Sequence, residues 1–163
     1  MMRRRLLLAV APAVLAGCGF ELRRAPDFAF KSILITSGSA VSTDLRRNLS
    51  SVPEMQVLPL SGRPDQAQVI LDVPEERRER VVVGVNASGQ VRELQLRIRM
   101  KFKLRTPQGK ELIPETELLQ QRDISFNETA VLAKEAEEGL LYRDMQNDLV
   151  QQLMRRLGAI KSL

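Results

Sequence analysis

The chain has 163 residues with 25 lysines and arginines, 20 aspartates and glutamates, one cysteine and no histidine. The absence of histidine removes the usual general base near neutral pH, the Ser-His and Cys-His nucleophile pairs and the commonest metal ligand. No glycine-rich phosphate loop follows a predicted strand, and the acidic residues are scattered, so we expect no cofactor, no metal and no enzymatic activity. A hydrolase with two catalytic carboxylates is the remaining enzymatic alternative.

The N-terminus has the parts of a secretory signal. Three arginines at 3–5 precede an apolar run at 6–16, which is shorter than the roughly 20 residues that a membrane span needs. The Leu-Ala-Gly-Cys sequence at 15–18 resembles a bacterial lipobox, in which the cysteine is acylated and becomes the mature N-terminus. We therefore predict that residues 1–17 are a signal peptide and that Cys18 is a lipid anchor.

The lone cysteine has two other interpretations, a free thiol or a small buried residue. By resemblance to bacterial lipoproteins, Cys18 would carry three acyl chains, palmitate among them, and more than one chain gives stable anchoring. Gly19 stands where Asp commonly signals retention in the inner membrane, so we predict the outer membrane, with the protein on its periplasmic side.

Removal of the signal peptide changes the charge balance. Cleavage removes three arginines, so 22 basic residues remain against 20 acidic ones. A nearly balanced chain outside the cytoplasm is a poor partner for nucleic acid, and we exclude that class. The remaining basic character is local.

The mature chain begins with an acylated N-terminus and tether over residues 18–28. Residues 29–163 are expected to form one domain. A strand is predicted at 30–36, followed by a short helix with Ser42 or Thr43 as its N-cap and Pro53 after its end.

The middle of the chain has strand patterns separated by turn residues. A weak strand is predicted at 55–58 and a stronger one at 68–73, which Pro74 and a charged run separate from a third at 81–85. Turns at 86–89 and 107–110 flank a long strand over 92–105, and another strand follows at 116–124. The last three strands are predicted to form an antiparallel meander.

The C-terminal segment has the strongest helical pattern. Over 128–157, apolar residues recur on one broad arc, and Asn127 is a suitable N-cap. The arc consists of Val131, Leu132, Ala136, Tyr142, Met145, Leu149, Val150, Leu153, Met154 and Leu157. These elements predict an α+β fold, a two-layer sandwich with two helices on one face of a roughly four-stranded mixed or antiparallel sheet.

The long strand carries a row of cations. Side chains alternate between the two faces of a strand, so the apolar residues at even positions from Leu94 to Leu104 share one face. The other face presents what we call the cation row: Arg97, Arg99, Lys101, Lys103 and Arg105.

Two interpretations of the cation row stay open. In one, acids on the neighbouring strands pair with the cations, and three of the five cations could find a partner in this way. Each such pair contributes about 0.2–1 kcal/mol to stability. The candidate partners are Glu75, Glu76, Glu79, Glu115, Glu117 and Asp123. In the other, the row contacts an anionic surface, such as the lipid A phosphates of lipopolysaccharide or an acidic protein cavity.

Two stretches resemble a known family. The Cys-Gly-Phe-Glu-Leu-Arg sequence at 18–23 and the helix at 128–157 are similar to those of the LptE family of lipopolysaccharide-assembly lipoproteins. The resemblance implies a plug inside the LptD β-barrel that helps the barrel assemble and contacts lipopolysaccharide. It also implies two helices on a four-stranded sheet. The alternative is a generic periplasm-facing lipoprotein scaffold with no role in glycolipid transport.

The resemblance also suggests contact residues. Lys134 matches the lysine of a family segment implicated in lipopolysaccharide contact, although a solvated flank charge is the other interpretation. Family members can carry a basic residue in the turn before the long strand, where this chain has Asn86-Ala87-Ser88-Gly89. The nearest cations are Arg92 and Arg80, and we take Arg92 as the better candidate for the second contact.

Overall fold

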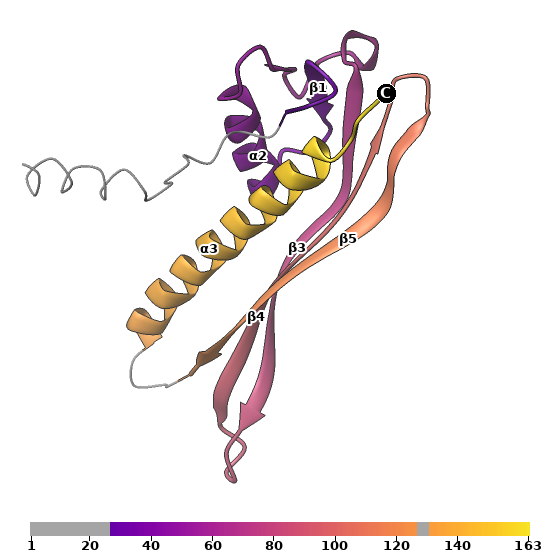
Figure 1. Cartoon of the computed structure of the whole chain (residues 1–163). Coiled ribbons are helices and arrows are strands. Elements are labelled where there is room, and N and C mark those ends of the chain that lie inside the picture. The colour runs from indigo at the N-terminus through magenta and orange to yellow at the C-terminus, as the bar shows by residue number, and fades with distance from the viewer. Residues whose placement is uncertain (1–26, 127–130) are drawn as a thin grey trace, which may run out of the picture.

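Three long antiparallel strands dominate a computed structural model that describes residues 27–126 and 131–163 (Figure 1). Cys18, the signal peptide, most of the tether and the expected N-cap Asn127 lie outside these residues. The strands are β1 (Ser32–Ile35), β2 (Gln56–Val57), β3 (Val69–Val85), β4 (Val91–Arg105) and β5 (Glu111–Ser125). The helices are α2 (Ala40–Ser50), the short 3-10 helix η1 (Pro64–Gln66) and α3 (Val131–Gly158).

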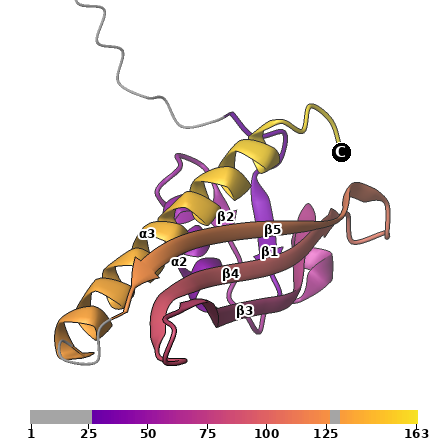
Figure 2. The same ribbon diagram turned by 90° about the horizontal axis from the view of Figure 1, so that it is seen from below.

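The strands form one mixed sheet in the order β2-β1-β3-β4-β5. β1 runs parallel to β2 and β3, whereas β3, β4 and β5 form the predicted antiparallel meander. Both long helices cover the same face of the sheet (Figure 2). The predicted α+β sandwich is confirmed, with five strands instead of about four because the two-residue β2 also pairs.

The prediction of separate strands at 68–73 and 81–85 was wrong. β3 is continuous over 17 residues and includes Pro74 and the charged run. The pairing with β4 shifts register between Asp72 and Glu75, which places Pro74 in a bulge. Proline has no N–H to donate, and a bulge leaves a residue out of the ladder, so the strand continues through it.

The predicted N-cap of the first helix was also wrong. α2 begins at Ala40 with Ser39 as its N-cap, and Ser42 is buried inside the helix. The Val41 backbone N–H donates a 3.2 Å hydrogen bond to Oε1 of Glu76 on β3. A carboxylate from the sheet thus satisfies an unpaired donor at the positive end of the helix, where the sequence pattern suggested a hydroxyl.

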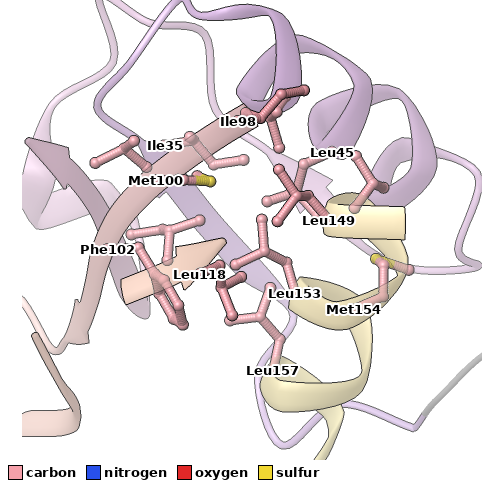
Figure 3. Packing of buried hydrophobic residues seen from close by; sticks show 14 of the residues in the cluster. Ile35, Leu45, Ile98, Met100, Phe102, Leu118, Leu149, Leu153, Met154 and Leu157 are labelled. Atoms are coloured by element: carbon pink, nitrogen blue, oxygen red, sulfur yellow. The ribbon is translucent and has the colours of Figure 1, made fainter. Parts of the chain in front are cut away.

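The core lies between the helices and the sheet. The predicted alternation in β4 is confirmed, since every even position from Leu94 to Leu104 is buried and the odd positions are only partly covered. The close-up in Figure 3 shows the β4 side chains facing those of the two helices. Labelled there are Ile35, Leu45, Ile98, Met100, Phe102, Leu118, Leu149, Leu153, Met154 and Leu157.

α3 buries its second half in this core, and its Leu141 and Tyr142 pack partly against it. Its buried residues begin at Met145, while Leu132 in the first turn is 82% exposed. Figure 1 shows the reason, because α3 crosses the sheet obliquely and its first turns lie at the edge, beside the end of β5. The apolar arc predicted from Val131 onward is therefore correct as a pattern, but Val131 and Leu132 at its N-terminal end remain exposed.

Candidate functional site

The eight candidate cations occupy two separate places. The cation row lies on the face of the sheet away from the helices, as the strand period predicts. The other three, which we call the distal cluster, each contact Ser125 or Phe126, at the end of β5. The distal cluster consists of Arg80, Arg92 and Lys134.

Three of the five row cations form ion pairs with carboxylates on neighbouring strands. Arg99 lies between β3 and β5, with Nε 3.7 Å from Glu79 Oε1 and Nη1 in contact with Glu117. Two further pairs link β4 to β3: Lys101 Nζ lies 3.5 Å from Glu75 Oε2, and Arg105 Nε lies 2.7 Å from Asp72 Oδ2. Most of the row is therefore neutralised within the sheet itself.

The partners differ in part from those that the sequence suggested. Glu75, Glu79 and Glu117 pair with the row as suggested. Glu76 instead faces α2, and Asp72, which was not among the candidates, pairs with Arg105. The bulge at Pro74 explains the change, because it alters which residues of β3 face each side.

Two row cations lack such a partner. Within the described residues, no carboxylate oxygen lies within 4 Å of the side-chain nitrogens of Arg97 or Lys103. Arg97 Nε donates a 2.7 Å hydrogen bond to Gln95 Oε1. Arg77 on β3 lies directly opposite Arg99, and its Nε lies 2.7 Å from Glu75 Oε1. Arg97 and Lys103 are thus the row cations that remain available for a contact outside the sheet.

Arg80 is the member of the distal cluster with the most hydrogen-bonding capacity to spare. Its guanidinium carbon lies 5.6 Å from the centroid of the Phe126 ring, and Nε lies 3.8 Å from Glu138 Oε2 on α3. Among the described residues, its guanidinium N–H groups donate no hydrogen bond. A guanidinium presents five donors, so this loosely paired side chain can bind an anion without breaking an existing bond.

The other two members are held more locally. Lys134 Nζ donates hydrogen bonds to Ser125 Oγ at 3.0 Å and to Glu137 Oε2 at 2.9 Å. Arg92 is exposed, and its Nη2 lies 3.3 Å from Gln90 Oε1. Its backbone carbonyl accepts a 2.8 Å hydrogen bond from Phe126 N–H, which brings it to the end of β5.

A groove lies beside the distal cluster. It has a volume of about 240 Å³ and sits between the β3–β4 hairpin and the end of β5. The sequence analysis did not find it, although residues 81–91 form an uncharged stretch in a chain in which 28% of residues are charged. The groove is lined by Arg80, Val82, Val91, Leu94 and Phe126.

Polar contacts hold α3 against the sheet next to this site. Arg78 Nη2 donates a 2.5 Å hydrogen bond to the buried Gln146 Oε1, and Arg122 Nη2 lies 2.7 Å from Asp148 Oδ2. These contacts set the position of the helix that carries Lys134.

The described residues contain no group of three or more potential metal-ligating side chains. In residues 27–126 and 131–163, no helix is both long enough and apolar enough to cross a membrane.

Comparison with known proteins connects this arrangement to a family. The family model LptE, described as lipopolysaccharide-assembly, matches residues 26–157. The LPS-assembly lipoprotein LptE of Pectobacterium atrosepticum is 25% identical over 166 residues, which cover 98% of this chain and 88% of that protein.

Solved structures share the fold. The solution NMR structure of the uncharacterized lipoprotein B from Nitrosomonas europaea has a TM-score of 0.73 and 32% identity, covering 86% of this chain and 91% of that one. The crystal structure of the rare lipoprotein B from Shewanella oneidensis has a TM-score of 0.62 and 17% identity, covering 78% of this chain and 94% of that one. At that identity the second likeness supports the fold alone.

Proposed function

The chain belongs to the LptE family, and we propose that it serves lipopolysaccharide assembly as a lipoprotein anchored through Cys18 to the periplasmic side of the outer membrane. In this proposal it forms a plug within the lumen of the LptD β-barrel, supports assembly of that barrel, and contacts lipopolysaccharide on its way to the cell surface. The observation that carries the proposal is the family match, which spans residues 26–157.

The exposed surface supports a protein partner. The described residues include several large hydrophobic side chains that remain open to solvent although they lie on regular strands and helices. A subunit enclosed by a partner need not satisfy such surfaces itself. They include Val82, Val83 and Val85 in the β3–β4 hairpin, Leu119 in β5, and Val131, Leu132 and Leu140 in α3.

The distal cluster supports contact with lipopolysaccharide. Arg80 has unused donors, Arg92 is exposed, and Lys134 comes from another element of the fold. Guanidinium groups bind phosphate through paired hydrogen bonds and lysine binds it as a point charge, so this combination suits the phosphates of lipid A.

The cation row suits a second, weaker role. Three of its members are already paired, which leaves Arg97 and Lys103 as the cations able to meet an acidic surface of the barrel. We assign no catalytic step to either group of cations, because the role proposed here is one of binding and guidance.

Co-purification tests this function. Outer membranes with a C-terminally tagged protein are extracted in detergent, and the proteins retained on an affinity resin are identified by mass spectrometry. We expect a large β-barrel protein in stoichiometric amount and lipopolysaccharide in the same eluate. Recovery of the folded lipoprotein alone, from the correct membrane, would instead favour the generic scaffold.

A further inference from the structure

The groove beside Arg80 combines an apolar interior with a cation at its rim. Val82, Leu94 and Phe126 contribute the apolar surface, and these residues come from β3, β4 and the segment after β5. Its volume of about 240 Å³ is below the roughly 300–1,000 Å³ of sites that enclose a whole small molecule. The groove therefore suits one narrow apolar group.

Arg80 makes the groove amphipathic. The side chain lines the groove, is about half exposed, and lies over the Phe126 ring with only Glu138 as a distant carboxylate partner. An apolar group in the groove would end beside this guanidinium. The ligand that complements both the groove and Arg80 is therefore an anion joined directly to a hydrocarbon.

The end of the β3–β4 hairpin, next to the groove, is also uncharged and apolar. Residues 81–91, which form the end of the β3–β4 hairpin, carry no charged side chain. Val82 is 50% exposed and Val85 is 59% exposed, so apolar surface continues from the groove along the hairpin. Figure 1 shows this hairpin projecting past the described start of α3.

We propose that this groove holds one acyl chain of an anionic lipid, with Arg80 bound to the phosphate of its headgroup. The inference rests on the proposed function only for the identity of the lipid, which would then be lipopolysaccharide. The proposal adds a hydrophobic subsite beside the distal cluster, formed by Val82, Val91, Leu94 and Phe126. Burial of the hydrocarbon against these side chains and the ion pair with Arg80 would act on the same molecule.

Photolabelling with a defined lipid tests the proposal. The full acylated protein is mixed, in detergent micelles, with phosphatidic acid that carries a diazirine at the end of one acyl chain. After irradiation, the labelled peptides are mapped by mass spectrometry. We expect the label on the peptides that contain Val82, Leu94 and Phe126, and a weaker label there from a diacylglycerol with the same chains.

Two neighbouring valines give a matched pair of variants. Val82 lines the groove, whereas Val83 is exposed to a similar extent, 47% against 50%, and does not line it. The Val82→Arg variant should lose at least about tenfold of the groove label, because a charge would stand where the chain packs. The Val83→Arg variant should keep it. Circular dichroism confirms that both variants remain folded.

Equal labelling of wild type and Val82→Arg, or a label spread evenly over the molecule, would overturn the proposal. An unlabelled groove in a protein that still co-purifies with a barrel would also overturn it, but would leave the proposed function intact and point to a protein side chain as the occupant. A labelled groove in a protein without a barrel partner would support the lipid subsite and reject the plug.

Discussion

The Tyr142 hydroxyl donates a 2.8 Å hydrogen bond to the backbone carbonyl of Glu79, which ties α3 to the middle of β3. The Arg78 guanidinium lies 5.1 Å from the centre of the same ring. Burial, followed by the charge of Glu138, raises the pKa of Tyr142 above its ordinary value. The hydroxyl therefore keeps its proton and its role as a donor in the folded protein.

This raised pKa can be measured directly, because the chain has one tyrosine and no tryptophan. We predict that tyrosinate absorbance in the folded protein appears at a pH above the value of about 10 usual for tyrosine. In concentrated urea the midpoint should return to about 10. A folded-state midpoint at or below the unfolded one would contradict the burial of this ring.

The same shift has a consequence for stability. At pH values between the unfolded and the folded pKa, the unfolded chain loses the Tyr142 proton while the folded chain retains it. The free energy of unfolding should therefore fall as pH rises above about 10. The Tyr142→Phe variant should lack this part of the pH dependence, as urea titrations at several pH values would show. At neutral pH the variant should lose about 1 kcal/mol with the hydrogen bond.

Two glycine-to-alanine changes should act in opposite directions. A Cβ at Gly84 would lie 2.9 Å from Cβ of Glu93 on the neighbouring strand, so Gly84→Ala should be destabilising. At Gly139 within α3, a Cβ meets nothing within 4 Å, so Gly139→Ala should stabilise by about 0.5–1 kcal/mol. Urea denaturation compares the two variants with wild type. The same sign for both would count against the described pairing of the hairpin.

Two leucines of α3 should differ sharply in their contribution to stability. Leu149 is fully buried between the layers, so Leu149→Ala should lower the free energy of unfolding by about 2–5 kcal/mol. Leu140, on the same helix, is 55% exposed, and Leu140→Ala should change the free energy by no more than about 0.5 kcal/mol. Similar losses in both variants would show that Leu140 also packs against the core.

The distal cluster and the cation row should differ in their effect on lipopolysaccharide binding. Replacing all three distal residues by Gln should weaken binding by at least about tenfold, since charge-assisted hydrogen bonds are lost. Binding is followed on immobilised protein at several salt concentrations. A control with the same change in charge should weaken binding by less than about threefold, because only long-range attraction falls. The control replaces Arg97, Lys101 and Lys103 by Gln.

The reverse ranking of these two variants would move the lipid contact to the outer face of the sheet. Equal and small effects would show that neither group of cations binds the phosphates.

Local patterns in the sequence were sufficient for the main elements of the fold. The alternation from Leu94 to Leu104 predicted which face of β4 is buried, because a strand places successive side chains on opposite sides regardless of its neighbours. The helical spacing near Leu149 and Leu153 likewise predicted the buried face of α3. The family could also be suggested from two short stretches, and the match over residues 26–157 confirms it.

Tertiary structure decided the relations between elements, since strand register and helix docking depend on contacts between distant residues. The bulge at Pro74 set the partners of the cation row, and the oblique path of α3 left Leu132 exposed. Pairing of β3, β4 and β5 brought Val82, Leu94 and Phe126 together beside Arg80. The hydrophobic period and the composition of each segment determined whether it forms a strand or a helix and which face is buried. The packing of the segments against one another determined where the groove lies.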